Sequence, residues 1–124
     1  MAFLIWGDQM KKINIISKAK EFENIIKHRR YYSNRYFVIY IMKKREKYFR
    51  FGISIPKKIG NSVTRNKLKR QIKNIIDNNK CFNKNLDYVI IARKEILNLK
   101  YINISDNLNF LLAKIDGEWT NENK

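Results

Sequence analysis

Cysteine, histidine and acidic side chains are scarce among the 124 residues of this sequence. The single cysteine, Cys81, cannot form a disulfide within the chain and has no second thiolate with which to build a zinc site. The only histidine is His28, and among the 11 Asp and Glu residues no acid pair or nucleophile with a neighbouring base stands out. We therefore expect no catalytic residue and no metal site on this chain.

Long apolar segments are also missing. The apolar run at the start covers only residues 2–6, too short to span a membrane or to form the core of a signal peptide, so we expect a cytoplasmic protein without a membrane partner. The sequence shows no internal repeat and no low-complexity linker, and its length fits one domain. We place that domain at residues 15–116, between a flexible N-terminal extension over 1–14 and a C-terminal tail over 117–124.

Positive charge is what the sequence has in excess. Its 27 Lys and Arg against 11 Asp and Glu give a formal net charge of +16, which is self-repelling unless a polyanion neutralises it. Disorder would explain so much charge, but 44% hydrophobic and 13% aromatic residues can bury enough apolar surface to offset chain entropy. We expect a folded basic domain that binds nucleic acid, with an anionic membrane surface as the weaker alternative.

Hydrophobic periodicity predicts a helix followed by two strands. Residues 18–28 form an amphipathic pattern, with Ser17 as the N-cap and Phe22 on a narrow apolar stripe. Residues 36–41 and 47–55 are rich in β-branched and aromatic side chains, and the charged break between them predicts an antiparallel hairpin. The side chains expected on the core face of the two strands are Phe37, Ile39, Ile41, Phe49, Phe51, Ile53 and Ile55.

The other face of this predicted hairpin combines aromatic and basic groups. With the registers of the two strands in agreement, Tyr36 and Tyr40 lie there on the side that carries Arg50 and Ser54. We expect this face to remain open to solvent.

A second helix, a strand and a third helix complete the chain. Pro56 closes the second strand, and a Gly-Asn turn leads into a helix that starts near Ser62 and ends at residues 77–79. Residues 87–93 form a continuous apolar run, which suits an interior strand, and Ser105 caps the last helix. The two helices have apolar stripes made of Leu68, Ile72, Ile75 and Ile76, and of Leu108, Leu111, Leu112 and Ile115. The order α-β-β(-β)-α-β-α is typical of an α+β two-layer sandwich, for which we expect a central mixed sheet.

The second helix carries the most unusual charge pattern. From residue 47 to residue 76 nine Lys and Arg occur without a carboxylate, whereas an ordinary surface helix mixes both signs to gain i,i+4 pairs. At about 100° per residue, Asn66, Arg70 and Lys73 lie opposite the apolar stripe, with Lys67 and Lys69 beside them. Phosphate groups would neutralise such a ridge through charge-assisted hydrogen bonds. A merely solvated helix face is the alternative interpretation.

This basic stretch resembles a known family signature. Residues 60–70 are GNSVTRNKLKR, similar to the pattern of the bacterial ribonuclease P protein, roughly G-N-x-V-x-R-N-R-x-K-R. Lys67 departs from the pattern by replacing an Arg, which keeps the charge but loses the planar fork for bidentate phosphate contact. The resemblance runs over residues 15–115 and includes NRYFVIY at 34–40, GISIPKKIGN at 52–61 and DYVIIARK at 87–94.

The resemblance implies that the chain is the protein subunit of a ribonucleoprotein endoribonuclease. In that family a large catalytic RNA carries out the chemistry and holds most of the Mg2+, and the holoenzyme cuts the 5′ leader from precursor tRNA. The expected partners are therefore this RNA and precursor tRNA, and the protein would promote Mg2+ binding. A left-handed crossover between two parallel strands is also implied. The residues expected to bind the RNA subunit are Lys57, Lys58, Asn61, Arg65, Asn66, Lys67, Lys69, Arg70 and Lys73.

For the leader, the resemblance implies a cleft between the first helix and the open face of the sheet. The residues expected to bind the leader are Phe22, Tyr36, Tyr40, Arg50 and Ser54. Base stacking on aromatic rings contributes about 1–3 kcal/mol per base in other single-strand binders. Ile26 stands where the family often has a second aromatic ring, and Phe22 fits a plain core position as well as it fits a stacking position.

Two other functions fit parts of the sequence. A non-enzymatic RNA-binding module such as a ribosomal protein would share the charge, size and aromatic face, although no KH-type GXXG loop is present. A stand-alone nuclease with its own metal site would need clustered ligands, which the sequence lacks. The identity of the RNA that co-purifies with the protein distinguishes a ribosomal protein from a ribonuclease P subunit.

Overall fold

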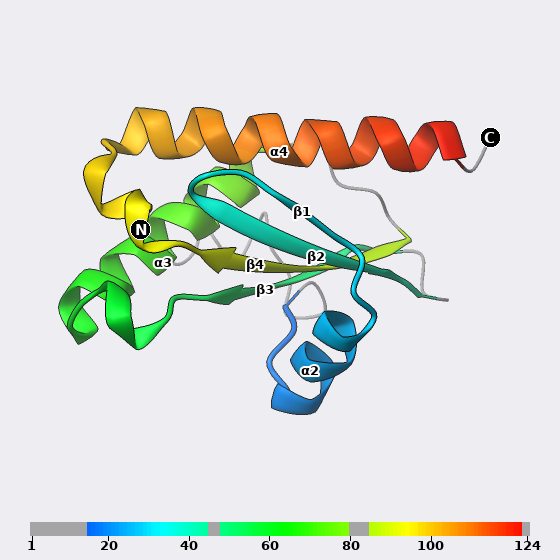
Figure 1. Ribbon diagram of the computed structural model, residues 1–124, viewed down its shortest axis with the longest axis horizontal. Helices are drawn as coiled ribbons and strands as arrows, with labels where there is room; N and C mark the ends of the chain where they lie inside the picture. Colours follow the sequence, from blue (N-terminus) through cyan, green and yellow to red (C-terminus); the bar gives the residue numbers. More distant parts are fainter. Residues whose placement is uncertain (1–14, 45–47, 80–84, 123–124) are drawn as a thin grey trace.

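A mixed sheet lies between helices on its two faces (Figure 1). The computed structural model describes residues 15–44, 48–79 and 85–122. The elements in these ranges are α2 (Ala19–Lys27), β1 (Tyr31–Ser33), β2 (Phe37–Lys43), β3 (Arg50–Ser54), α3 (Ser62–Asn78), β4 (Leu86–Ala92) and α4 (Tyr101–Glu122), with the short 3-10 turns η2 (Lys57–Ile59) and η3 (Lys94–Asn98). The predicted α+β fold with a mixed sheet is confirmed.

The strand order is β1-β2-β4-β3, and this order corrects the predicted hairpin. β2 does not pair with β3, because β4 lies between them, antiparallel to β2 and parallel to β3. β4 is buried along nearly its whole length, so burial on both faces favours the interior position. β3 carries Arg50, Gly52 and Ser54 and takes the edge instead.

Helix α3 connects the two parallel neighbours β3 and β4. A parallel pair needs such a crossover, since a tight turn can join only antiparallel strands. The left-handed sense expected for this connection stays a prediction.

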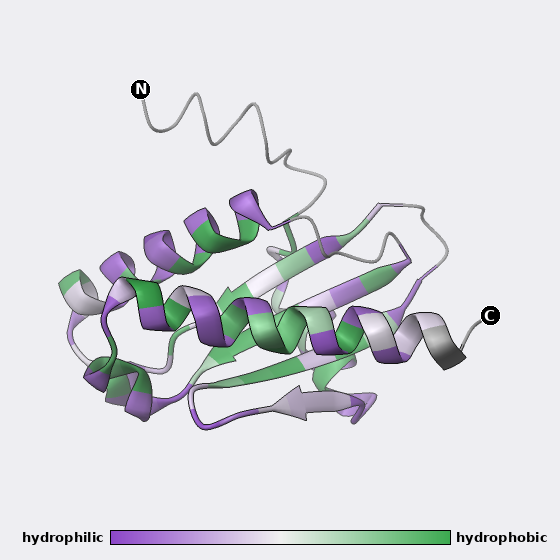
Figure 2. Cartoon of the chain, turned by 90° about the horizontal axis from the view of Figure 1, so that it is seen from above, coloured by the Kyte–Doolittle hydropathy of each residue, from purple (hydrophilic) through white to green (hydrophobic). Residues whose placement is uncertain are grey.

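The main core lies between the sheet and helices α3 and α4. Phe37, Ile39 and Ile41 are fully buried there, as predicted, and Phe51 joins them from β3. Both predicted helix stripes are buried in the same cluster: Leu68, Ile72, Ile75, Ile76, Leu108, Leu111, Leu112 and Ile115. Figure 2 shows the corresponding pattern along the ribbon, with largely hydrophobic strands and a helix α3 that alternates between hydrophilic and hydrophobic residues.

The last helix is longer than the sequence suggested. It starts at Tyr101, and Ser105 is not its cap but accepts a hydrogen bond within the helix from Nδ2 of Asn109 at 3.3 Å. The helix also continues through most of the expected tail. Trp119 is buried against the core and lies under the guanidinium of Arg30, 5.1 Å from the ring centroid. These contacts hold the segment after residue 116 against the rest of the protein. The sequence analysis ended the apolar stripe at Ile115 and so did not include Trp119.

Two further boundaries differ from the predictions. The N-cap of α2 is Lys18 without a side-chain hydrogen bond, so Ser17 lies one residue outside the helix end. The short strand β1, which pairs with β2, was not located by the hydrophobic pattern because three residues are too few to establish a period. The N-terminal extension expected over residues 1–14 lies outside the described residues.

A buried ion cluster fixes α2 and β3 against β4. Asp87 on β4 is 1% exposed, and both of its carboxylate oxygens accept hydrogen bonds from Arg50, at 3.0 and 2.7 Å. Lys44 approaches the same carboxylate at 3.4 Å. The guanidinium of Arg50 also reaches Glu21 on α2 at 2.7 Å. The hydrogen bond to Asp87 is the main cause that raises the pKa of Arg50, although burial acts against it.

Arg50→Met should lower the free energy of unfolding by about 3 kcal/mol, because it leaves a buried carboxylate without its bidentate partner. Urea denaturation followed by circular dichroism measures this loss. The double variant Arg50→Met with Asp87→Asn should lose clearly less than the sum of the two single variants, since it removes both charges. Additive losses would show that the pair is not an energetic unit.

Candidate nucleic-acid interface

The outer surface of α3 is a cationic ridge, as the sequence predicts. Asn66, Lys67, Lys69 and Arg70 are exposed, whereas Lys73 is only partly exposed. The opposite side of the helix is held in the main core, so the ridge stands on a rigid element. Part of the ridge borders an open hollow of about 480 Å³ lined by Val63, Asn66, Lys69, Arg70 and Lys73. Such a surface can bind phosphates without rearranging its backbone.

Two residues that we expected to bind RNA make hydrogen bonds within the protein at the start of α3. Asn61 is the N-cap, and its side-chain oxygen accepts a hydrogen bond from the backbone N–H of Thr64 at 2.9 Å. Arg65 folds back, with its Nε donating to the carbonyl oxygen of Gly60 at 3.1 Å. Both side chains therefore help to form the turn that starts the helix. Lys57 and Lys58 are exposed on η2 just before this turn.

Arg93 and Lys94, which the sequence analysis did not single out, lie at the same end of the sheet as Lys57 and Lys58. Because β3 and β4 are parallel, their C-terminal ends lie at one end of the sheet. The turn η2 follows β3 there, and the exposed Arg93 and Lys94 follow β4. The turn before β2 also reaches this end, where Arg93 donates to the carbonyl oxygen of Asn34 at 3.3 Å. Only the strand order could have indicated this grouping, because the residues are far apart in sequence.

The face of the sheet that carries α2 contains some, but not all, of the residues expected to bind a leader. Phe22 and Tyr40 pack around a small cluster formed by the buried Ile16, Ile25 and Val89. This cluster covers part of the face that we expected to be open.

Two of the expected leader residues lie elsewhere or are already engaged. Tyr36 packs against the main core instead, because it lies in a bend where its backbone N–H donates to the side chain of Asn34 at 2.9 Å, so the alternation of β2 does not extend to it. Arg50 is on the expected side of the sheet but is bound by Asp87 and Glu21. Ser54 is partly buried at the end of β3.

Phe22 lies against the backbone of β3. Its ring comes so close to Gly52 that a Cβ atom at that position would collide with it. Glycine is required here by space, and it lets an aromatic ring form a wall above the strand. The ring packs on the α2 cluster and also borders a cavity, and its role in stacking on a base stays a prediction.

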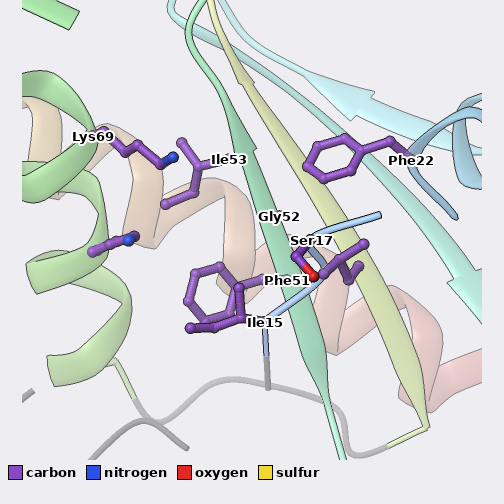
Figure 3. A pocket seen from close by; sticks show the side chains of 9 residues that line it. Ile15, Ser17, Phe22, Phe51, Gly52, Ile53 and Lys69 are labelled. Carbon is purple, nitrogen blue, oxygen red and sulfur yellow. The ribbon is translucent and has the colours of Figure 1, made fainter. Parts of the chain in front are cut away.

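We call this space the β3-edge cavity. It has a volume of about 330 Å³ and lies between the segment before α2, the strand β3 and helix α3 (Figure 3). The segment before α2 is held at the strand edge by a hydrogen bond from the N–H of Ile16 to the carbonyl oxygen of Phe51, at 2.9 Å. On the side of α3 the cavity is lined by Lys69 and Lys73. Partial burial, and to a smaller extent the charge of Lys69, lowers the pKa of Lys73.

The sequence analysis named Tyr40 but missed the exposed aromatic ring beside it, Tyr31. Tyr31 is 55% exposed, and its ring centroid lies 5.4 Å from that of Tyr40, its partner in the β1–β2 register. The pair adds a possible stacking surface beside α2. The sequence signal was weak, because Tyr31 belongs to a strand of only three residues.

Neither a metal cluster nor a membrane helix is found in the described ranges. Within residues 15–44, 48–79 and 85–122, no group of three or more His, Cys, Asp and Glu side chains is placed to hold a metal ion. In the same ranges no helix is long and apolar enough to cross a membrane.

Comparisons with known proteins agree with the motif at residues 60–70. A family model described as ribonuclease P matches residues 10–116. A ribonuclease P protein component from Streptococcus agalactiae is 41% identical over 108 residues, which cover 87% of this chain and 98% of that protein. A second, from Streptococcus pneumoniae, is 40% identical over 104 residues and covers 83% of this chain and 85% of its own length.

Solved structures show the same fold. A Staphylococcus aureus RNase P protein mutant, described as defective in mRNA degradation activity, superimposes with a TM-score of 0.79 at 34% identity, covering 88% of this chain and 93% of the other. The RNase P protein from Thermotoga maritima gives a TM-score of 0.73 at 32% identity, covering 80% of this chain and 94% of the other.

Substitutions at Asn61 can separate its capping role from RNA binding. Asn61→Ala should lower the free energy of unfolding by about 1 kcal/mol, whereas Asn61→Asp keeps an acceptor for the N–H of Thr64 and should not. Urea denaturation measures both. Asn61→Asp also adds a negative charge near Lys57 and Lys58, so it should weaken RNA binding in a low-salt titration. Wild-type RNA affinity for this variant would place Asn61 outside the interface.

Proposed function

This chain belongs to the ribonuclease P protein family, and we propose that it assists the catalytic RNA in removing the 5′ leader of precursor tRNA in the cytoplasm. As a ribonuclease P protein component it is part of an endoribonuclease holoenzyme of tRNA processing and has the RNA subunit as its partner. Our proposal concerns how it contributes: it binds the RNA subunit, binds the leader, and promotes Mg2+ binding by the RNA.

The observation that supports this role most strongly is the ridge on α3. Its cations are exposed on a helix whose other side is fixed in the core, and no acid offsets them between residues 47 and 76. The mutual repulsion of Lys67, Lys69 and Arg70 is removed when phosphates replace their counterions. Cations at fixed positions on a rigid helix can match the fixed positions of the phosphates in a folded RNA.

We assign the catalytic centre to the RNA. In its described ranges the protein has no group of three or more His, Cys, Asp and Glu side chains placed to hold a metal ion, and we expect Mg2+ to be held mainly by the RNA. Cations on the ridge reduce the repulsion between RNA phosphates. An RNA that is screened in this way needs less free Mg2+ to adopt its active fold.

The leader side of the proposal is supported by the surface around α2. Phe22 borders the β3-edge cavity, and Tyr40 lies with the exposed Tyr31 on the same face of the sheet. Aromatic rings beside a cationic groove are the usual means of binding single strands without strict sequence preference. Arg50 is not assigned to the leader, because its guanidinium is shared by two carboxylates.

A ribosomal protein or similar RNA-binding module is the second candidate, since it would share the charge and the aromatic face. Co-purification separates the two functions. Recovery of one free catalytic RNA with the protein supports our proposal, and recovery with ribosomal subunits supports the alternative.

Adding the protein to its cognate catalytic RNA at low Mg2+ should stimulate cleavage of precursor tRNA. Arg70→Ala should raise the protein concentration needed for half-maximal stimulation and reduce the dependence of log affinity on log salt by about one phosphate contact. Lys114→Ala is the matched control, because Lys114 is exposed on α4, in the helix layer across the sheet from α2.

The absence of any stimulation by the wild-type protein would contradict the proposed function. Equal effects of Arg70→Ala and Lys114→Ala would show instead that only the net charge matters, and that the ridge is not a specific binding surface.

Phe22→Leu keeps an apolar side chain on the α2 cluster but removes the aromatic ring. Affinity of the holoenzyme for precursor tRNA should fall by about 1 kcal/mol or more, the lower end of the stacking contribution, while affinity for leaderless tRNA should stay the same. Equilibrium binding of the two substrates measures the difference. Equal losses on both would assign Phe22 a purely structural role.

A further inference from the structure

Helix α4 has an apolar face that is exposed to solvent. Ile102 is 66% exposed and Phe110 is 73% exposed. At about 100° per residue these two side chains point away from the buried stripe of the helix, and the exposed Ala113 and Gly117 lie between them around the helix axis. Figure 1 shows α4 as an outer layer of the molecule, on the other side of the sheet from α2. The outer α4 face, as we call this side, consists of Ile102, Asp106, Phe110, Ala113, Lys114 and Gly117.

Gly117 is the least expected residue of this face. Glycine in the middle of a helix is less favourable than alanine by about 0.5–1 kcal/mol. A Cβ atom at this position would have no neighbour within 4 Å, so packing inside the protein does not require glycine. The missing side chain leaves a hollow beside Ala113, and side chains of a second helix pack into such hollows. A partner helix would account for both the small residues and the exposed large ones.

The charge of α4 indicates which kind of partner fits. Residues 101–120 contain three acids, Asp106, Asp116 and Glu118, and one base, Lys114, in a chain whose net charge is +16. These carboxylates repel phosphates, so the outer α4 face is unsuited to RNA. The face is also separate from the cationic ridge, because α3 contacts the edge strand β3 whereas α4 contacts β1 at the opposite edge of the sheet. The partner that fits is therefore a protein with an apolar surface.

The outer α4 face is complementary to itself when two copies lie antiparallel. Asp106 lies four residues before Phe110, and Lys114 lies four residues after it. A two-fold axis beside Phe110 therefore brings Asp106 of each copy next to Lys114 of the other, which forms two intermolecular ion pairs. The same arrangement places the two Phe110 rings together and Ile102 over the hollow at Gly117.

We propose that the outer α4 face forms an antiparallel dimer with a second copy of this chain. A single pair of helices in contact over residues 102–117, about 22 Å of helix, buries less than the roughly 1,200–2,000 Å² of stable complexes. The dissociation constant of the dimer is therefore on the order of 10–100 μM. This inference goes beyond the proposed function and does not depend on it, because the association needs no RNA.

The dimer leaves the surfaces proposed to bind RNA available. The ridge on α3 and the aromatic groups around α2 lie outside the outer α4 face. In a cleavage assay at nanomolar protein the dimer dissociates, so Lys114→Ala keeps its value there as a control for RNA binding.

Sedimentation equilibrium of the full chain without RNA tests the inference. The measurement needs about 0.3 M salt, because charges farther apart than about 8 Å are then screened and the net charge of +16 no longer keeps the copies apart. The wild-type protein should change from monomer to dimer between about 1 and 500 μM. Phe110→Ser should remain monomeric throughout this range. Val63→Ser, which removes a similarly exposed apolar side chain from α3, should dimerise as the wild type does.

Gly117→Gln separates the interface from folding. A glutamine at this position favours the helix and meets no neighbour within the chain, so the free energy of unfolding should not fall. The same side chain fills the hollow and should weaken the dimer at least about tenfold. Urea denaturation and sedimentation equilibrium measure the two effects.

An exchange of charges tests the antiparallel arrangement. Asp106→Lys and Lys114→Asp each place like charges opposite one another twice, so each variant alone should dimerise at least about tenfold more weakly than the wild type. An equimolar mixture of these two variants restores both ion pairs and should form a heterodimer about as strong as the wild-type dimer. Lys94→Asp makes the same change of charge outside α4 and should dimerise as the wild type does.

The possible outcomes separate this inference from the proposed function. A wild-type protein that stays monomeric over the whole range would overturn the inference, and so would a dimer that persists in Phe110→Ser. If the mixture of Asp106→Lys and Lys114→Asp did not associate, the antiparallel arrangement on which the inference rests would be wrong. None of these results bears on the stimulation of cleavage at low Mg2+, which tests the proposed function.

Discussion

The guanidinium of Arg50, shared between Asp87 and Glu21, is the interaction on which the arrangement of this protein depends. Asp87 is almost fully buried on the central strand β4, and a carboxylate in that position must be paired. Arg50 satisfies it from the neighbouring position on β3, so the ion pair specifies the register of the parallel strands. The same group holds Glu21 at 2.7 Å, and Glu21 directly precedes Phe22. One side chain thus positions the edge strand and the helix whose ring closes over Gly52.

Helix α3 has one face packed in the main core and the other face exposed to solvent. Its inner stripe belongs to the main core, and its outer face bears the exposed cations. Core packing holds these cations at fixed spacing, which would lower the entropy lost in the RNA binding that we propose for them. Repulsion among them opposes folding, and burial of the stripe offsets it. The helix can therefore carry a charge pattern that would be unfavourable on an isolated surface helix.

Local sequence patterns predicted most helices and strands correctly, but they did not predict which strands pair or which side chains interact over long distances in the sequence. The bounds of α3 were predicted from the Gly-Asn turn before Ser62 and from an apolar period of 3.6, both of which are local features of the chain. The hairpin was wrong because pairing depends on which strand is most buried, and β4 comes after α3 in the chain. Arg50 was taken for a nucleic-acid ligand because its carboxylate partner is 37 residues away. Tyr36 was placed on the wrong face because a bend at residues 35–36, where its N–H donates to the side chain of Asn34, interrupts the alternation.

The sequence by itself determined the fold class, the buried stripes of both long helices and the presence of an acid-free cationic helix, since periodicity and composition are local properties of the chain. The tertiary structure alone decided that β4 separates β2 from β3, that Arg50 is bound within the protein, and that Lys69 and Lys73 border the same cavity as Phe22. Such contacts join distant segments, and their geometry follows from how the whole core buries its apolar surface.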